Sequence, residues 1–332
     1  MTGLRDVLDS ALEVPVVPSF TLVGPVVRSR LDGWRPLGSY DLTGRVVVLT
    51  GPTSGLGLAA AEQLSRCGAT LVLVGRDRAR TEAVTRRLAE LPGSPAPAPA
   101  ADVVVADLGD LDAVRAAAVE ISHRYPRVDV LLHNAGALSP TRSVTSAGLE
   151  ATVASQVVGP FLLTALLLPS LRAAAPGRVI TMSSGGLYAT GLTVQGLQMG
   201  ERDYRGAEQY ARAKRAQVTL TQTWAQTVPA DEVVFHSVHP GWADTPGVRT
   251  SLPTFRRVTG PLLRTPAQGA DTMVWLAADD GAPLRWSGLF WLDRRPRSLH
   301  RLPATRRSDT PERRDELWRW VVRQGSVPDP RG

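Results

Sequence analysis

The stretch Thr50-Gly51-Pro52-Thr53-Ser54-Gly55-Leu56-Gly57 lies between a strand-like run, Val46–Leu49, and a helical pattern that continues to Arg66. Its three glycines permit a tight turn, a close approach of the backbone to a diphosphate, and close packing of the helix on the sheet. The N-terminus of the helix offers free N–H groups and the positive end of its dipole to phosphates. A glycine pattern alone is weak evidence, but this one has the strand–turn–helix context that a dinucleotide site requires. The stretch therefore predicts a dinucleotide-binding turn.

Runs of strand length alternate with longer helical patterns from this stretch onward. Continuous valine and leucine runs suit strands that are buried on both faces of a parallel sheet. The alternation predicts an α/β protein: a Rossmann-like, doubly wound parallel sheet of about seven strands with helices on both faces, a three-layer sandwich. The strands are predicted at Val46–Leu49, Thr70–Val74, Val103–Ala106, Val128–Leu132, Arg178–Met182, Val233–Val238 and Leu289–Leu292, and the helices at Leu56–Arg66, Arg80–Leu91, Leu111–Arg124, Leu149–Arg172, Gln209–Thr227 and Ala267–Ala278.

The composition excludes several classes of protein. The 332 residues are 43% hydrophobic and 21% charged, close to globular averages, so a disordered or fibrous chain is excluded. The single cysteine, Cys67, excludes an intramolecular disulfide framework and a cysteine-based zinc site, and no histidines have metal-ligand spacing, so we expect no metal. No apolar run reaches the ~18 residues of a membrane span, and no secretory signal is recognised. We therefore expect a cytoplasmic protein without a transmembrane segment.

Both ends of the chain differ from the strand–helix region. Residues 1–43 are predicted to form an N-terminal arm with a short amphipathic helix, which either packs against the domain or contacts a membrane surface or partner. Residues 44–300 are predicted to be a single domain that holds the dinucleotide and substrate sites, and residues 301–332 a basic extension with a helix. The proline-rich segment 92–100 is predicted to be a mobile surface loop. The apolar face of the arm's helix consists of Leu4, Val7, Leu8, Ala11 and Leu12.

Basic residues are unevenly distributed. The net charge is +7, and from Arg285 to Arg331 twelve arginines stand against six acidic residues. Because the acidic residues are interspersed, a solvated helix is favoured over a nucleic-acid or anionic-membrane surface, and we expect no nucleic acid.

Of the 38 basic residues, Lys214 alone is a lysine. In a chain so biased towards arginine, it indicates a place that needs a compact ammonium on a flexible stem.

Further motifs follow the glycine turn in order along the chain. They are Asp107-Leu108 after the third strand, Asn134-Ala135-Gly136 after the fourth, Tyr210 and Lys214 with Tyr-x-x-x-Lys spacing, and Pro240-Gly241 with Thr245 as Pro-Gly-x-x-x-Thr. Together with the Thr-Gly-x-x-x-Gly-x-Gly turn, this set resembles the short-chain dehydrogenase/reductase family from about Leu42 to Asp293. The resemblance implies an NAD(P)-dependent oxidoreductase that acts on a carbonyl or secondary alcohol.

The resemblance also implies which residues hold the dinucleotide. They are Gly51, Thr53, Ser54, Gly55, Leu56 and Gly57 in the turn, Asp107 and Leu108 at the adenine, and Asn134, Ala135, Gly136, Tyr210, Lys214, Pro240, Gly241 and Thr245. Arg76 is the first side chain past the second strand and can pair with a 2′-phosphate, which favours NADP(H) over NAD(H). In the alternatives, Arg76 only stacks on adenine, or Asp77 turns inward and selects NAD(H).

Tyr210 and Lys214 lie four residues apart on a helical pattern, so both project from one face of a helix. A nearby ammonium favours the phenolate, so we expect Lys214 to lower the pKa of Tyr210 and to hold the nicotinamide ribose. Ser184 ends a strand-derived run and can hydrogen-bond the substrate oxygen, where charge builds during hydride transfer. These residues predict Tyr210 as general acid and base, with Lys214 and Ser184 as its catalytic partners.

One position departs from the family's pattern. Three residues before Gly159 the family commonly has an asparagine, which positions a water in the proton path from the lysine, and this chain has Gln156. Glutamine carries the same donor and acceptor groups on a stem one methylene longer. Either Gln156 serves as the catalytic relay residue or the relay is lost. The alternative to an active enzyme is therefore a cofactor-binding regulator or scaffold with weakened turnover.

The substrate and the assembly are the least specified features. Leu187, Tyr188, Trp242 and the segment that follows to Arg264 are predicted to line the pocket, and their apolar character indicates a small, lipophilic substrate. The resemblance also implies that the helices at 149–172 and 209–227 form a four-helix homodimer interface. A monomer is the alternative.

Overall fold

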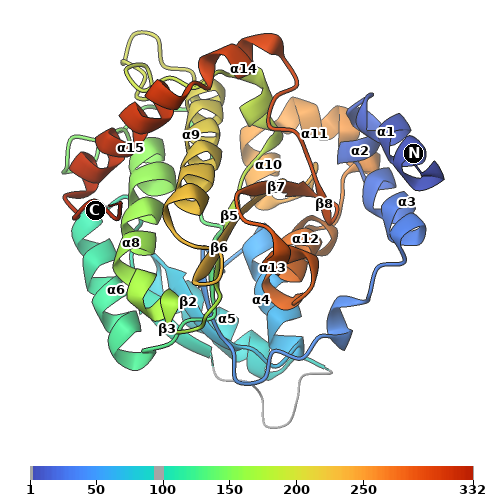
Figure 1. The fold of residues 1–332 in the computed structure, drawn as a ribbon, viewed down its shortest axis with the longest axis horizontal. Helices are drawn as coiled ribbons and strands as arrows, with labels where there is room; N and C mark the ends of the chain where they lie inside the picture. The colour runs from blue at the N-terminus through green and yellow to red at the C-terminus, as the bar shows by residue number, and fades with distance from the viewer. Residues whose placement is uncertain (1–2, 93–100, 332) are drawn as a thin grey trace.

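An eight-stranded sheet crosses the molecule, and its first seven strands are parallel (Figure 1). The computed structural model describes residues 3–92 and 101–331, so residues 93–100 of the predicted proline-rich loop lie outside the described residues. The strand order is β3-β2-β1-β4-β5-β6-β7-β8, so the sheet grows outwards from β1 and β4. The strands are β1 (Val46–Thr50), β2 (Thr70–Gly75), β3 (Ala101–Val105), β4 (Val130–His133), β5 (Gly177–Met182), β6 (Val233–Val238), β7 (Leu289–Leu292) and β8 (Arg295–Pro296).

The predicted doubly wound sheet is confirmed, with one strand more than the seven expected. The additional strand, β8, pairs antiparallel with β7. Asp293 and Arg294 between them both have left-handed backbone, with φ of 53° and 55°. Two such residues in succession form the tight turn of a two-residue hairpin. Because this pair lacks the glycine that usually signals such a turn, the sequence pattern does not predict it.

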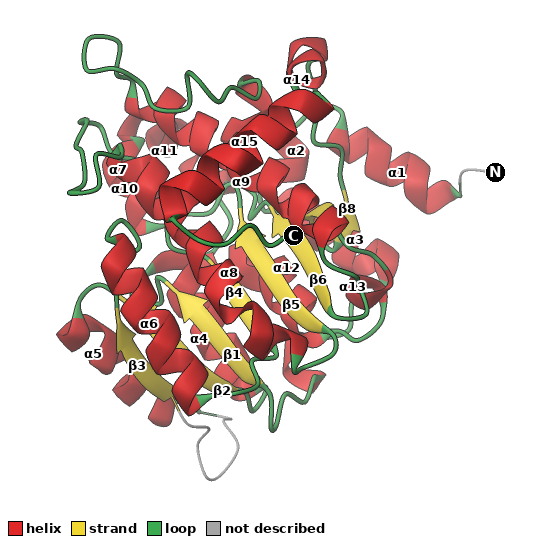
Figure 2. Ribbon diagram, turned by 60° about the vertical axis from the view of Figure 1, so that its left-hand side comes forward, coloured by secondary structure: helices red, strands yellow, loops and turns green. Residues whose placement is uncertain are grey.

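Helices cover both faces of the sheet, as predicted (Figure 2). Successive strand residues point to opposite faces, so Val48 packs in one core, whereas Val47 and Leu49 pack in the other. One face carries α4 (Gly55–Arg66), α5 (Arg78–Ala89) and α12 (Pro266–Ala278), and the other α6 (Leu111–Arg124), α8 (Gly159–Arg172) and α9 (Gly206–Thr227). The remaining helices are α1 (Leu4–Glu13), α2 (Val17–Phe20), α3 (Val23–Asp32), η1 (Leu37–Ser39), α7 (Ala151–Val153), η2 (Ala154–Val158), η3 (Gly185–Ala189), α10 (Pro246–Ser251), α11 (Pro253–Thr259), η4 (Gly260–Leu262), α13 (Ala282–Arg285), α14 (Pro303–Ser308) and α15 (Pro311–Gly325).

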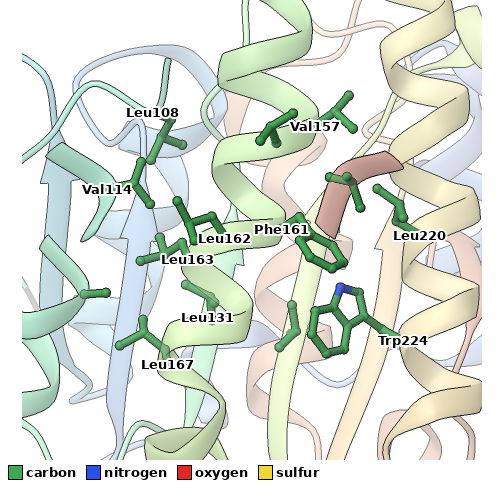
Figure 3. Packing of buried hydrophobic residues seen from close by; sticks show 14 of the residues in the cluster. Leu108, Val114, Leu131, Val157, Phe161, Leu162, Leu163, Leu167, Leu220 and Trp224 are labelled. Carbon is green, nitrogen blue, oxygen red and sulfur yellow. The ribbon is translucent and has the colours of Figure 1, made fainter. Parts of the chain in front are cut away.

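The larger core is built around α8, which is almost wholly apolar. Leu163 and Leu167 pack there with Leu131 of β4, and Phe161 contacts Trp224 of α9 (Figure 3). Among the described residues, one helical stretch, Ala151–Arg172, is long and apolar enough to span a membrane. Because 78% of its most apolar window is buried inside the molecule, the stretch has the environment of a core helix.

The two ends of the chain lie on opposite sides of the molecule (Figure 1). α1 confirms the helix predicted in the arm, but Val7 and Leu8 of its apolar face are exposed, while Asp9 is buried. The C-terminal extension forms two helices, of which α15 packs on α8 and α9. α15 therefore occupies part of the surface through which a dimer is predicted. Dimerisation and membrane contact by the arm stay predictions.

Candidate active site

The glycine turn joins β1 to α4 at the point where the strand order reverses. Gly51 and Gly55 have positive φ, 68° and 55°, and a Cβ on Gly57 would collide with the carbonyl oxygen of Gly51. The side chain of Asn134, at the end of β4, donates to the carbonyl groups of Thr50 (3.2 Å) and Gly51 (3.0 Å). Glycine is thus required in the turn, and the Asn134 amide group holds the turn in shape.

The turn leaves backbone N–H groups open to an anion. The side chain of Ser54 does not cap the first turn of α4, so N–H groups there stay available. A Cβ atom added to Gly51 would lie 2.8 Å from Ala135 Cα, and a Cβ atom added to Gly55 would lie 3.3 Å from Thr245 Cγ2. Three motifs that are far apart in the sequence therefore meet at one edge of the sheet, in an arrangement that fits a dinucleotide diphosphate.

The residues predicted to face the adenosine half of the dinucleotide follow β2 and β3. Arg76 is exposed, whereas the carboxylate of Asp77 is engaged as the N-cap of α5, where it accepts the N–H of Arg80 (3.0 Å). Asp107 is exposed, and Leu108 beside it is buried in the core. The side chains of Arg76 and Asp107 are thus accessible to a ligand, and the side chain of Leu108 is not.

Ser184, Tyr210 and Lys214 meet beside the end of β5. Ser184 is the N-cap of η3, and its hydroxyl accepts the N–H of Gly186 (3.3 Å) and hydrogen-bonds Tyr210. Lys214 is buried and donates to the carbonyl group of Met182 (2.9 Å). Its Nζ lies 5.3 Å from the centroid of the Tyr210 ring. The structure therefore brings the three predicted residues together.

Burial governs the protonation of this cluster. It raises the pKa of Tyr210 to about 12, and the hydrogen bond with Ser184 opposes that rise. Burial also lowers the pKa of Lys214 to about 7. The expected lowering of the Tyr210 pKa by Lys214 is therefore wrong for this structure, because removal from water penalises the charged forms of both groups. Tyr210 is a neutral phenol at pH 7.

Gln156 lies beside Lys214 in the π-helical turn η2. Its Nε2 donates to the carbonyl group of Ala137 (2.7 Å), while its Oε1 is buried and has no partner among the described residues. Both side chains lie beside Gly136, where an added Cβ atom would be 2.8 Å from Gln156 Oε1 and 3.3 Å from Lys214 Nζ. The glutamine thus carries an unused acceptor near the ammonium, in a type of helical turn that is frequent at functional sites.

The residues predicted to line the substrate pocket lie in two environments. Leu187 and Tyr188 are buried in a third core cluster, which also contains Phe20 of the arm, and their role at the pocket stays a prediction. Trp242 is half-buried and packs edge-on against Phe255, with 5.1 Å between the ring centroids. Sequence reasoning missed Phe20 of the arm, which packs on Trp242 with a centroid distance of 5.7 Å. No motif spacing connects the two residues, so no sequence signal could have found this contact.

A doubly wound parallel sheet with a glycine turn at its switch point, and a tyrosine–lysine pair beside that turn, defines an NAD(P)-dependent oxidoreductase. The sequence matches the family described as "short chain dehydrogenase" over residues 45–254, and the chain belongs to this family. It therefore acts on CH–OH or carbonyl groups with an NAD(P) cofactor.

Individual relatives agree with this assignment. The chain is 39% identical to human "Dehydrogenase/reductase SDR family member 12", over 83% of this chain and 85% of the relative. It is 34% identical to human "Retinol dehydrogenase 14", over 77% of this chain and 80% of the relative. A solved structure of an uncharacterized protein from Mycobacterium paratuberculosis is similar with a TM-score of 0.69 and 26% identity, covering 89% of this chain and 99% of that one.

Proposed function

We propose that the enzyme uses NADP(H) and moves hydride between the nicotinamide and the carbonyl or secondary alcohol of a small, lipophilic substrate. The observation that carries the proposal is the meeting of Ser184, Tyr210 and Lys214, whose ammonium group lies beside Gly136. Gly136 follows Ala135, which contacts the glycine turn, so the polar cluster lies next to the dinucleotide site.

Tyr210 is the proton donor of the reduction. Its pKa of about 12 keeps the phenol protonated at neutral pH, which suits a general acid. The Ser184 hydroxyl beside it donates a hydrogen bond to the substrate oxygen, where negative charge builds as hydride arrives. In the oxidation the step runs in reverse: the phenolate that remains after Tyr210 has lost its proton accepts the proton of the alcohol.

Gln156 and Lys214 return a proton to Tyr210. The Oε1 of Gln156, which has no partner among the described residues, supports this role, because such a buried acceptor suits a water between it and the Lys214 ammonium. The same residue supports a second candidate function. If the longer side chain does not sustain the relay, the protein binds its cofactor as a regulator or scaffold and turns over weakly.

The choice of NADP(H) rests on the tip of β2. The carboxylate that would select NAD(H), that of Asp77, caps α5, whereas Arg76 is exposed and able to pair with a 2′-phosphate. The glycine turn would hold the diphosphate and Lys214 the nicotinamide ribose. When bound, the dinucleotide supplies or accepts the hydride.

A lipophilic substrate is supported by two observations. The half-buried ring of Trp242 lies between Phe20 and Phe255, which gives this side of the site an apolar surface. A relative with 34% identity is named for retinol, an apolar alcohol.

A screen of aldehydes and ketones with NADPH tests the proposal. We expect turnover by the wild-type protein and none above background by Tyr210→Phe, which removes the proton donor and little else. Fluorescence titration with NADPH should give the same Kd for both proteins within about twofold, because Tyr210→Phe leaves the glycine turn and Arg76 intact. NADPH binding without turnover of any compound would support the regulator instead.

A further inference from the structure

The N-terminal arm lies against the loops that carry the reacting residues. Phe20 is 3% exposed, and its ring packs edge-on against His239 and Trp242, with centroid distances of 4.3 Å and 5.7 Å. The ring also lies against Gly185, where an added Cβ atom would be 3.2 Å from Phe20 Cε2. Because Gly185 directly follows Ser184, the Phe20 ring lies one residue from the predicted substrate hydrogen-bond donor.

Backbone hydrogen bonds attach the arm to the segment that follows β6. The carbonyl group of Phe20 accepts the N–H of Trp242 (2.7 Å) and the Nε–H of Arg264 (3.0 Å). Two residues further along the arm, the N–H of Leu22 donates to the carbonyl group of Leu262 (3.0 Å). The arm thus binds both ends of the segment 242–264, which was predicted to line the substrate pocket.

Buried ion pairs hold the arm in this position. Arg264 pairs with Asp293 (2.6 Å), and Arg28 of the arm pairs with Asp293 and Asp9 (2.6 Å each). The side chains of Arg28, Arg264 and Asp293 are at most 2% exposed. A buried charge that loses its partner is strongly unfavourable, so these pairs define one position of the arm on the domain.

We propose that Phe20 forms a wall of the substrate site and limits the size of the carbonyl compound that reaches Ser184. The proposal rests on the proposed hydride transfer and adds to it a specificity-determining residue from outside the strand–helix domain. The edge-on contacts of Phe20 with His239 and Trp242 place its ring between the Ser184 loop and the segment after β6. A smaller side chain at this position would therefore open space against Gly185, in the loop that carries Ser184.

The test compares Phe20→Ala with Val14→Ala in the full-length protein. Val14 belongs to the same arm but is 78% exposed, so its replacement removes a similar kind of side chain outside the site. With NADPH, we expect Phe20→Ala to raise the kcat/KM ratio of 2-naphthaldehyde over benzaldehyde at least about tenfold, the size of effect that shape gives in an apolar pocket. Val14→Ala should leave the ratio within about twofold of wild type, and the NADPH Kd should not change in either variant.

A ligand-binding assay compares the same variants without requiring turnover. With NADP⁺ present, 2-naphthol and phenol are titrated by quenching of tryptophan fluorescence, and Phe20→Ala should favour 2-naphthol by a similar factor. If Phe20→Ala does not fold, Phe20→Leu keeps an apolar contact and should shift the ratio in the same direction. Ratios equal to those of Val14→Ala in both assays would overturn the role of Phe20. If the wild-type protein reduces neither aldehyde but the naphthol preference shifts, Phe20 remains a wall of the site and the proposed hydride transfer fails.

Discussion

The N-terminal arm packs on the domain through buried charges, whereas the C-terminal helix α15 packs through apolar side chains. In the arm, Arg28 is fully buried and pairs with Asp9 and Asp293. In α15, Trp318 has no exposed surface and contacts Phe161 and Trp224 with centroid distances of 5.0 Å and 4.8 Å. The two ends of one chain thus pack on opposite sides of the molecule with different chemistry (Figure 1).

The difference indicates what each end does. Ion pairs and hydrogen bonds are directional, so the arm is held in one geometry beside Ser184, where a small displacement changes the shape of the site. Apolar contacts depend mainly on buried area and tolerate repacking. We therefore expect changes in α15 to alter stability alone, and changes in the arm to alter both stability and substrate choice.

The largest effect is expected from Trp318→Ala. The variant should lose about 3–5 kcal/mol of unfolding free energy, because it leaves a cavity between α8, α9 and α15. Urea unfolding followed by circular dichroism measures the loss, and Trp286→Ala, at a tryptophan that is 61% exposed, is the matched control. A change in the naphthaldehyde-to-benzaldehyde ratio would contradict the division between the two ends.

Arg28→Met should have the next largest effect, about 3 kcal/mol of unfolding free energy, because it removes a buried cation from its partners. This loss of unfolding free energy lies near the lower end of the range for broken buried ion pairs, because Asp293 still pairs with Arg264 and Asp9 still pairs with Arg297. We also expect the aldehyde ratio to shift in the direction of Phe20→Ala. The exposed Arg30 on the same helix provides the control Arg30→Met. A loss of stability without any shift in the ratio would reduce the arm to a structural role.

Arg76 is an exposed charge at the cofactor site, so its contribution to binding free energy should be smaller than the contribution of the buried charges of the arm to stability. Fluorescence titration is expected to give NADPH at least about tenfold tighter binding than NADH, because a charge-assisted pair contributes about 1.5–3 kcal/mol. Arg76→Ala should abolish most of this preference and leave the aldehyde ratio unchanged. Equal affinities in the wild-type protein would remove the role given to Arg76.

Lys214 differs from the paired arginines of the arm because burial lowers its pKa to about 7 with no acidic group among the causes. The ammonium form therefore predominates below about pH 7 and is lost as the pH rises. We expect kcat/KM for carbonyl reduction to fall towards tenfold per pH unit above that point. A pH profile from 5 to about 9 checks this, and a flat profile would exclude a catalytic role for the lysine charge.

Local spacing predicted those parts of the fold and site that neighbouring residues determine. The turn from Gly51 to Gly57 was predictable because its strand, glycines and helix are consecutive. Tyr210 and Lys214 were predictable as a pair because four residues bring two side chains to one helix face. For the same reason, the parallel strands and their helices were found close to their observed bounds.

Features that depend on distant contacts were not predictable. The contact of Phe20 with Gly185 joins segments that share no motif, and the burial of Phe20 together with Leu187 and Tyr188 in one core cluster also depends on such distant contacts. The pKa of Tyr210 depends on how completely the fold removes it from water, which spacing alone does not determine.

The most direct test of the proposed chemistry is the turnover number of Lys214→Arg with NADPH and an accepted aldehyde. The substitution keeps a positive charge but replaces a compact ammonium by a planar, bulkier group, which would misplace both the ribose and Tyr210. Far-UV circular dichroism and the melting temperature establish that the variant is folded. The account predicts a loss in kcat of about 10²-fold or more, as expected for misaligned acid–base groups. Turnover by folded Lys214→Arg at the wild-type rate would contradict it.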